Sequence, residues 1–186
     1  MNPTREIAWK LLTQHTKGEG LIKHALAVEA AMQAYARSFK EDQQQWGICG
    51  LLHDFDYEQN PHPKDHPRVG GKILRELGYP EDMIYAIKAH ADHMKLERRS
   101  RMDKALFAVD ELCGFVTAVA YVRPGKLEGM KAKSVRKKMK SKNFAAAVKR
   151  EDITQGAELL GMEVNEHITQ VITAMQGAAG ELGLAD

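Results

Sequence analysis

The sequence has few of the residues that fix a chain through covalent bonds or hold it in a bilayer. Two of its 186 residues are cysteines, and both Cys49 and Cys113 stand among apolar neighbours outside any CxxC pair. We interpret them as reduced core residues in a reducing compartment. No apolar run approaches the roughly 20 residues of a membrane span, and the charged start MNPTREIAWK lacks the apolar segment of a secretory signal. These absences indicate a cytoplasmic protein without a membrane partner.

β-Strand signals are also missing, whereas helical periodicity recurs along the chain. Apolar residues recur at spacings of three and four, and proline or glycine interrupts the pattern. We expect helices over residues 20–39, 42–53, 68–78, 80–94 and 103–121, a loop over 55–67, and two or three helices between 131 and 184. The sequence therefore predicts an all-α protein. We expect one domain over residues 1–186, with core helices in 20–125 and a helical extension in 126–186.

Charge is distributed unevenly, although the net charge is only +2. Residues 126–150 hold ten Lys or Arg and one acid, whereas residues 151–186 hold seven acids and no Lys or Arg. Such a basic stretch is typical either of a solvated helix docked on the acidic segment or of an anion-binding face. We favour the solvated helix, because its lysines spread over several faces. Only Phe144 interleaves them, so a platform for stacking nucleic-acid bases is unsupported.

Histidine and aspartate interrupt the apolar faces of four expected helices, at His24, His53, His90 and Asp110. Each alone is more typical of a hydrogen-bonded core histidine or a salt-bridged aspartate. Together they would need separate partners that the sequence does not offer, and a buried carboxylate without a partner is costly. Imidazoles and carboxylates are ligands of hard and borderline divalent ions, and no cysteine accompanies them as in a structural thiolate zinc site. The pattern predicts a metal site.

The order of these residues resembles the HD superfamily of metal-dependent phosphohydrolases. The resemblance depends on His24, on the pair His53-Asp54 at a helix end, and on Asp110 within the run Ala-Val-Asp-Glu-Leu. His66 and His90 resemble the additional histidines of its HDIG-type, two-metal members. The likeness spans residues 20–125. Within the chain, residues 21–57 and the basic segment over 131–150 most resemble small stand-alone bacterial HD proteins described as predicted hydrolases.

The resemblance implies a role for each of these residues. In that family the first histidine, the His-Asp pair and the last aspartate hold one metal ion, which here would be His24, His53, Asp54 and Asp110. His66 and His90 would help to hold a second ion that shares Asp54, and Asp54 is therefore the candidate catalytic residue. Two ions can activate a water molecule and clamp a phosphate. The implied cofactor is one or two divalent ions, with Fe, Mn, Mg, Zn, Co and Ni not distinguished.

The sequence departs from the two-metal pattern at one position. Such members usually have two adjacent histidines where this chain has His90-Ala91-Asp92-His93. On a continuous helix His93 would lie roughly 60° around the axis from His90, so it is either a further ligand or a surface residue. Asp92 is either a general base or a solvent-facing residue, and we favour the second. Three further histidines are expected outside the site, namely His15, His62 and His167.

We expect a hydrolase that acts on a phosphomonoester or phosphodiester in a small, nucleotide-like substrate through a metal-activated water. An anionic substrate also needs cationic contacts, and we predict Arg123 and Lys126, just after the helix over 103–121, as substrate-binding residues. Two alternatives remain open. One is a di-iron oxygenase on the same fold, and the other is a regulatory module that binds a nucleotide, or RNA through residues 131–150.

Overall fold

The computed structural model describes residues 3–185, and helices are the only regular elements in that range. The first half contains α1 (Arg5–His15), α2 (Glu19–Phe39), α3 (Gln43–Leu51), α4 (Arg68–Glu76), α5 (Glu81–Ala89) and the short 3₁₀ helix η1 (Asp92–Met94). The second half contains α6 (Arg101–Tyr121), α7 (Ala132–Met139), α8 (Arg150–Leu159), α9 (Val164–Gly177) and α10 (Ala179–Leu182). The prediction of an all-α protein is confirmed.

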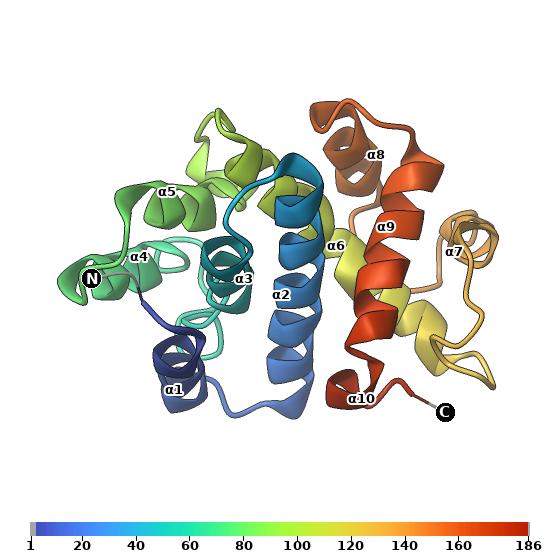
Figure 1. Cartoon of the computed structure of the whole chain (residues 1–186), viewed down its shortest axis with the longest axis horizontal. Helices are drawn as coiled ribbons and strands as arrows, with labels where there is room; N and C mark the ends of the chain where they lie inside the picture. The colour runs from blue at the N-terminus through green and yellow to red at the C-terminus, as the bar shows by residue number, and fades with distance from the viewer. Residues whose placement is uncertain (1–2, 186) are drawn as a thin grey trace.

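Two helices of 21 residues each, α2 and α6, pack against each other in the middle of the bundle. In Figure 1, α1, α3, α4 and α5 lie on one side of α2, and α7 to α10 lie on the other. The predicted apolar stripe of α2 is buried at Val28, Met32 and Tyr35. A reciprocal capping box between Ser100 and Asp103 begins α6 and satisfies backbone donors of its first turn. These two helices provide the frame of the candidate site.

The helix predicted to continue through Met94 ends earlier. α5 ends at Ala89, His90 caps it, and η1 follows after a break in the chain direction. The side chain of Arg98, which follows the break in the sequence, stabilises it through two hydrogen bonds. Arg98 donates to the backbone oxygen of His90 at 3.2 Å and to the Asp92 carboxylate at 2.5 Å. Apolar periodicity alone does not reveal such a contact. The prediction of a continuous helix over residues 80–94 was therefore wrong after Ala89.

The C-terminal part contains four helices rather than the two or three expected, because the chain turns again before α10. α8 approaches α6 so closely that a Cβ atom at Gly156 would lie 2.6 Å from the Cα atom of Ala108. His167 on α9 is fully buried, with Nε2 donating to the carbonyl oxygen of Ala108 and Nδ1 accepting from the Tyr35 hydroxyl. Helices α8 and α9 therefore attach firmly to the middle of α6.

The basic segment over residues 131–142 is largely solvated. Val135 is buried in the core and Ala132 and Met139 pack against it, while most of the lysines and Arg136 are exposed. Within residues 3–185 no ion pair joins this segment to the acidic residues after 150, so α7 does not dock on them through charge. None of the described helices is both long and apolar enough to cross a membrane.

Candidate metal centre

A cavity of about 550 Å³ opens between the N-terminal helices and the layer of α6 and α8. Four histidines and two aspartates of the predicted site either line it or lie directly beneath it. The lining consists of His24, Asp54, Tyr57, His66, His90, Ala91, Asp92, His93, Phe107, Asp110, Glu111, Gly114, Lys149 and Asp152. The cavity has the size of a site for a small metabolite.

The first cluster brings together side chains from α2, the end of α3 and α6. His24 Nε2 lies 2.9 Å from Asp110 Oδ1, although the two residues are 86 positions apart in the chain. His53 Nε2 lies 3.5 Å from the same oxygen and 3.6 Å from Asp54 Oδ2. Ligand atoms of His24, His53 and Asp54 all lie within 4.8 Å of one another, close enough to share one metal ion.

A second cluster uses the other oxygen of the Asp54 carboxylate. Asp54 Oδ1 lies 3.2 Å from His66 Nε2 and 3.2 Å from His90 Nε2. These three groups also lie within 4.8 Å of one another. Asp54 therefore belongs to both clusters, one through each carboxylate oxygen, which is the arrangement expected of a bridging ligand.

Hydrogen bonds at Nδ1 set the imidazole tautomers. His53 Nδ1 lies 2.7 Å from the carbonyl oxygen of Gly50, and His90 Nδ1 lies 2.5 Å from that of Ile87. A carbonyl oxygen only accepts, so both Nδ1 atoms carry the proton and neutral rings keep a lone pair on Nε2. In both rings it is Nε2 that lies near the aspartates. Histidines that bind a metal through one ring nitrogen commonly donate the N–H of the other to a backbone carbonyl in this way.

Two buried polar atoms in the cluster have no hydrogen-bond partner within the described chain, His53 Nε2 and Asp54 Oδ1. Buried polar atoms are usually hydrogen-bonded, so such a pair needs an explanation. One lone pair on an imidazole nitrogen and one on a carboxylate oxygen are suited to a cation and not to each other. The donor set therefore fits a divalent ion that prefers nitrogen and oxygen ligands.

Burial and charge act in opposite directions on these groups. Burial lowers the pKa of His53 and His90, but the carboxylates of Asp54 and Asp110 outweigh it and raise both pKa values. Burial acts in the same direction on His66, but hydrogen bonds to Asp54 and Asp56 outweigh it and raise the pKa of His66 to about 9. The imidazoles hold the pKa of Asp54 and Asp110 well below its usual range despite burial. Both carboxylates are ionised at neutral pH, and an incoming cation would displace protons from the imidazoles.

His93 joins neither cluster. It lines the cavity, but Nε2 donates to the backbone oxygen of His66 at 2.8 Å. This position follows from η1, which turns the chain away from the axis of α5. Asp92 is exposed as predicted, although it also borders the cavity.

Arg123 and Lys126, expected to bind the substrate, are not among the residues that line the cavity. Arg123 donates to the backbone oxygens of Lys126 and Glu128, and Lys126 Nζ donates to those of Gly183 and Ala185. Asp110 is near the middle of α6, and the 13 residues to Arg123 correspond to about 20 Å of helix. The two cations therefore fix the turn after α6 and the C-terminal segment.

Asp56 is a site residue that the sequence analysis missed. It is buried, with Oδ1 2.8 Å from His66 Nδ1 and Oδ2 accepting the backbone N–H of Gly70 at 2.7 Å. A Cβ atom at Gly70 would lie 2.8 Å from Asp56 Cγ, so the glycine makes room for this contact. The alternation in His-Asp-Phe-Asp, with a second carboxylate two residues after Asp54, is a signal that could have identified it.

The outer wall of the cavity was also missed. Glu111, Lys149 and Asp152 come from α6 and the start of α8 and face the cavity together. Burial, with the Asp110 carboxylate nearby, raises the pKa of Glu111 to about 7. Burial and Asp92 raise the pKa of Asp152. Because α8 follows α6 by almost thirty residues, only the tertiary fold brings this wall to the site.

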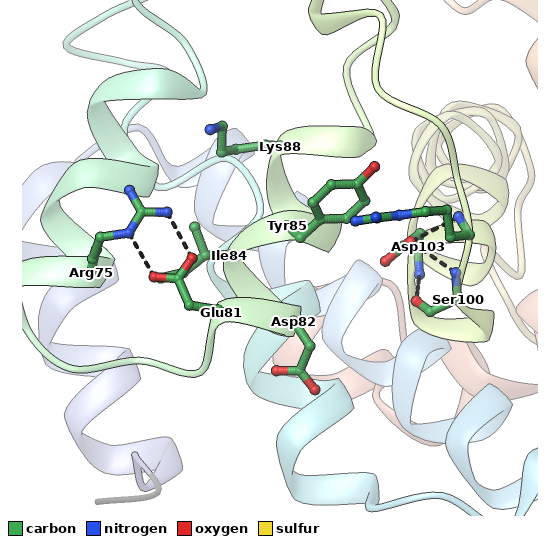
Figure 2. A pocket seen from close by; sticks show the side chains of 9 residues that line it. Arg75, Glu81, Asp82, Ile84, Tyr85, Lys88, Ser100 and Asp103 are labelled. Atoms are coloured by element: carbon green, nitrogen blue, oxygen red, sulfur yellow. Dashed lines mark hydrogen bonds and ion pairs between the residues drawn. The ribbon is translucent and has the colours of Figure 1, made fainter.

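A separate hollow of about 450 Å³ lies on the other face of α5 (Figure 2). Its charged groups largely satisfy one another: Arg75 pairs with Glu81 at 2.6 Å, and the Arg99 guanidinium stacks on the Tyr85 ring. None of the described residues that line it is a histidine. It lacks the nitrogen ligands of the larger cavity and is not a candidate metal centre.

Comparison with known proteins gives one family and one relative. The model of the HD domain family matches residues 21–174, more than half of the chain. A protein of Methanocaldococcus jannaschii, described as uncharacterized, is 32% identical over 77 residues. The match covers 39% of this chain and 45% of that protein, so the chain spans less than half the length of this relative. No solved structure gives a significant match.

Proposed function

Because this chain belongs to the HD domain family, we propose that it is a metal-dependent hydrolase of a phosphomonoester or phosphodiester. The observation that supports this most directly is the position of Asp54, whose two oxygens serve two adjacent clusters of histidines. We propose Asp54 as the residue that links two divalent ions. Two ions would favour diester or anhydride bonds, and one ion would favour a monoester.

The first ion would be held by His24, His53, Asp54 and Asp110, and the second by Asp54, His66 and His90. Bound there, the ions would supply Lewis-acid activation of water and neutralise charge on the phosphate. The chain itself contributes ionised carboxylates, imidazoles fixed in the tautomer that presents Nε2, and a partly enclosed cavity. About 550 Å³ accommodates a nucleotide-sized substrate.

Elemental analysis of protein purified without added metal is the decisive experiment. We expect one or two equivalents of a divalent ion, and none in Asp54→Ala. Metal-loaded protein should hydrolyse p-nitrophenyl phosphate or bis-p-nitrophenyl phosphate, and the ratio of the two rates would distinguish monoesterase from diesterase. Asp65→Ala, which changes an exposed aspartate in the loop before α4, is the matched control and should keep both metal and activity.

The proposal would be refuted if none of Fe, Mn, Mg, Zn, Co or Ni binds, or if the loaded protein hydrolyses neither ester. Two bound irons with substrate-dependent uptake of dioxygen would instead favour an oxygenase. Nucleotide or RNA binding that survives Asp54→Ala, but is lost when Lys137, Lys138 and Lys140 are neutralised, would favour a regulatory module.

A further inference from the structure

Lys149 is the one lysine or arginine among the described residues that line the cavity of the candidate metal centre. The remaining charged residues of the lining are carboxylates and imidazoles. An anionic substrate that enters this cavity meets a single fixed cation of the chain besides any metal. This position differs from that of the other basic residues between 126 and 150, which are spread over α7 and the turns around it.

The backbone of Lys149 is held close to the candidate metal centre. Its N–H donates to Glu111 Oε2 at 3.3 Å, and Glu111 is the neighbour of Asp110 on α6. Lys149 is also the N-cap of α8, the helix that packs on α6 through Gly156. Helix dipole and ammonium charge therefore have the same sign at this end of the cavity.

The ammonium group of Lys149 is only loosely held. Nζ lies 3.8 Å from Asp92 Oδ2 and 3.9 Å from Asp152 Oδ2, beyond the distance of a hydrogen bond. The side chain is 61% exposed. Asp92 has a much closer partner in Arg98, at 2.5 Å. The three N–H donors of Lys149 are thus free to bind an anionic oxygen, and a four-carbon stem allows the group to move toward it.

From this geometry we propose that Lys149 binds a phosphate oxygen of the substrate, and that Asp152 competes with the substrate for the same ammonium group. The inference rests on the proposed function and specifies how its cavity recognises an anion. Lys149 takes the role that the sequence analysis assigned to Arg123 and Lys126. It acts in substrate binding, so its removal should change KM far more than kcat.

The first test compares Lys149→Met with Lys137→Met, which removes an exposed lysine of α7 outside the cavity. A charge-assisted hydrogen bond to phosphate corresponds to about a tenfold change in affinity. We expect Lys149→Met to raise KM for p-nitrophenyl phosphate about tenfold with little change in kcat. Lys149→Arg should stay close to the wild type, and so should Lys137→Met. Equal KM values for Lys149→Met and Lys137→Met would overturn the proposal.

Asp152→Asn gives a second test with the opposite sign. Removing the competing carboxylate should lower KM by about two- to threefold, since the ammonium group of this long pair is exposed to solvent. In the Lys149→Met background the same change should have little effect on KM, because the ammonium group for which Asp152 competes is gone. If Asp152→Asn lowers KM equally in both backgrounds, Asp152 acts by simple repulsion and the competition is refuted. If Lys149 only formed a structural ion pair with Asp152, Lys149→Met and Asp152→Asn would both lower the stability of the protein and leave KM unchanged.

Binding of inorganic phosphate to the metal-loaded protein, measured by calorimetry, separates this inference from the proposed function. A protein without esterase activity refutes the hydrolase, yet weaker phosphate binding in Lys149→Met than in Lys137→Met would still support the role of Lys149. Esterase activity together with identical phosphate binding in the two variants would support the hydrolase and refute the inference.

Discussion

Asp56→Asn should weaken metal binding although Asp56 is not itself a proposed ligand. The carboxylate accepts from two donors, His66 Nδ1–H at 2.8 Å and Gly70 N–H at 2.7 Å, through different oxygens. An asparagine has one acceptor oxygen and can satisfy only one of them. If its amide nitrogen faces His66, the neutral ring must carry its proton on Nε2, which removes the lone pair that would bind the ion. If the nitrogen faces Gly70, two donors oppose each other in a buried site.

The magnitudes follow from the two contacts. Loss of a hydrogen bond that orients a metal-binding histidine typically weakens metal affinity about 10- to 100-fold. A buried donor left without an acceptor lowers the free energy of unfolding by about 1–3 kcal/mol. The second effect should be present in the metal-free protein, whereas the first requires the ion, so the two can be measured separately.

The assay is metal titration by calorimetry, with urea unfolding of the metal-free form alongside. Asp65→Asn makes the same chemical change at an exposed position of the same loop and should leave both quantities unchanged. Equal metal affinity in Asp56→Asn and Asp65→Asn would contradict the reasoning. It would mean either that His66 does not bind the ion or that Asp56 does not fix its tautomer.

Three further predictions concern stability. Gly156→Ala should lower the free energy of unfolding by about 1–3 kcal/mol, because the new methyl meets the backbone of α6; Gly177→Ala, with open space around it, should not. Burial lowers the pKa of His167 to about 4, so acid should destabilise the protein between the unfolded value near 6.5 and about 4, by about 3 kcal/mol; a His167→Gln variant with the same slope over this range in acid unfolding would disprove this. A divalent ion at 100 times its Kd at pH 7 should stabilise the protein by about 3 kcal/mol. At that fixed ion concentration, thermal melts should show a larger gain as pH rises toward 9, since His66 must lose its proton; a gain independent of pH, or one retained in Asp54→Ala, would argue against this cluster as the binding site.

Most helices were predictable because their apolar periodicity is local information. The stripe of α2 and the inward positions of His24, His53 and Asp110 needed only a count along one helix. The end of α5 was not predictable in this way. Ala91 to Met94 continue an acceptable helical pattern, and the side chain that stops the helix, Arg98, acts across a break.

The candidate ligand set was accessible from sequence, whereas its surroundings were not. His66 and Asp54 could be named from their order in the chain, but the wall that faces them depends on how α8 packs against α6. Arg123 is close in sequence to the end of α6 and far from Asp110 along its axis. Lys149 is distant in sequence and near in space. Proximity in the chain is therefore a poor guide to which cations line this cavity.

The separation of His24 and Asp110 by 86 residues also determines when the site can exist during folding. Joining two points that far apart in a flexible chain costs about 4 kcal/mol in loop-closure entropy, beyond a constant term. No helix pair formed early from neighbouring segments contains both residues. During synthesis, the aspartate emerges long after the first histidine. A metal ion that met the nascent chain would therefore find only part of the candidate site, and complete loading would require the packing of α6 onto α2.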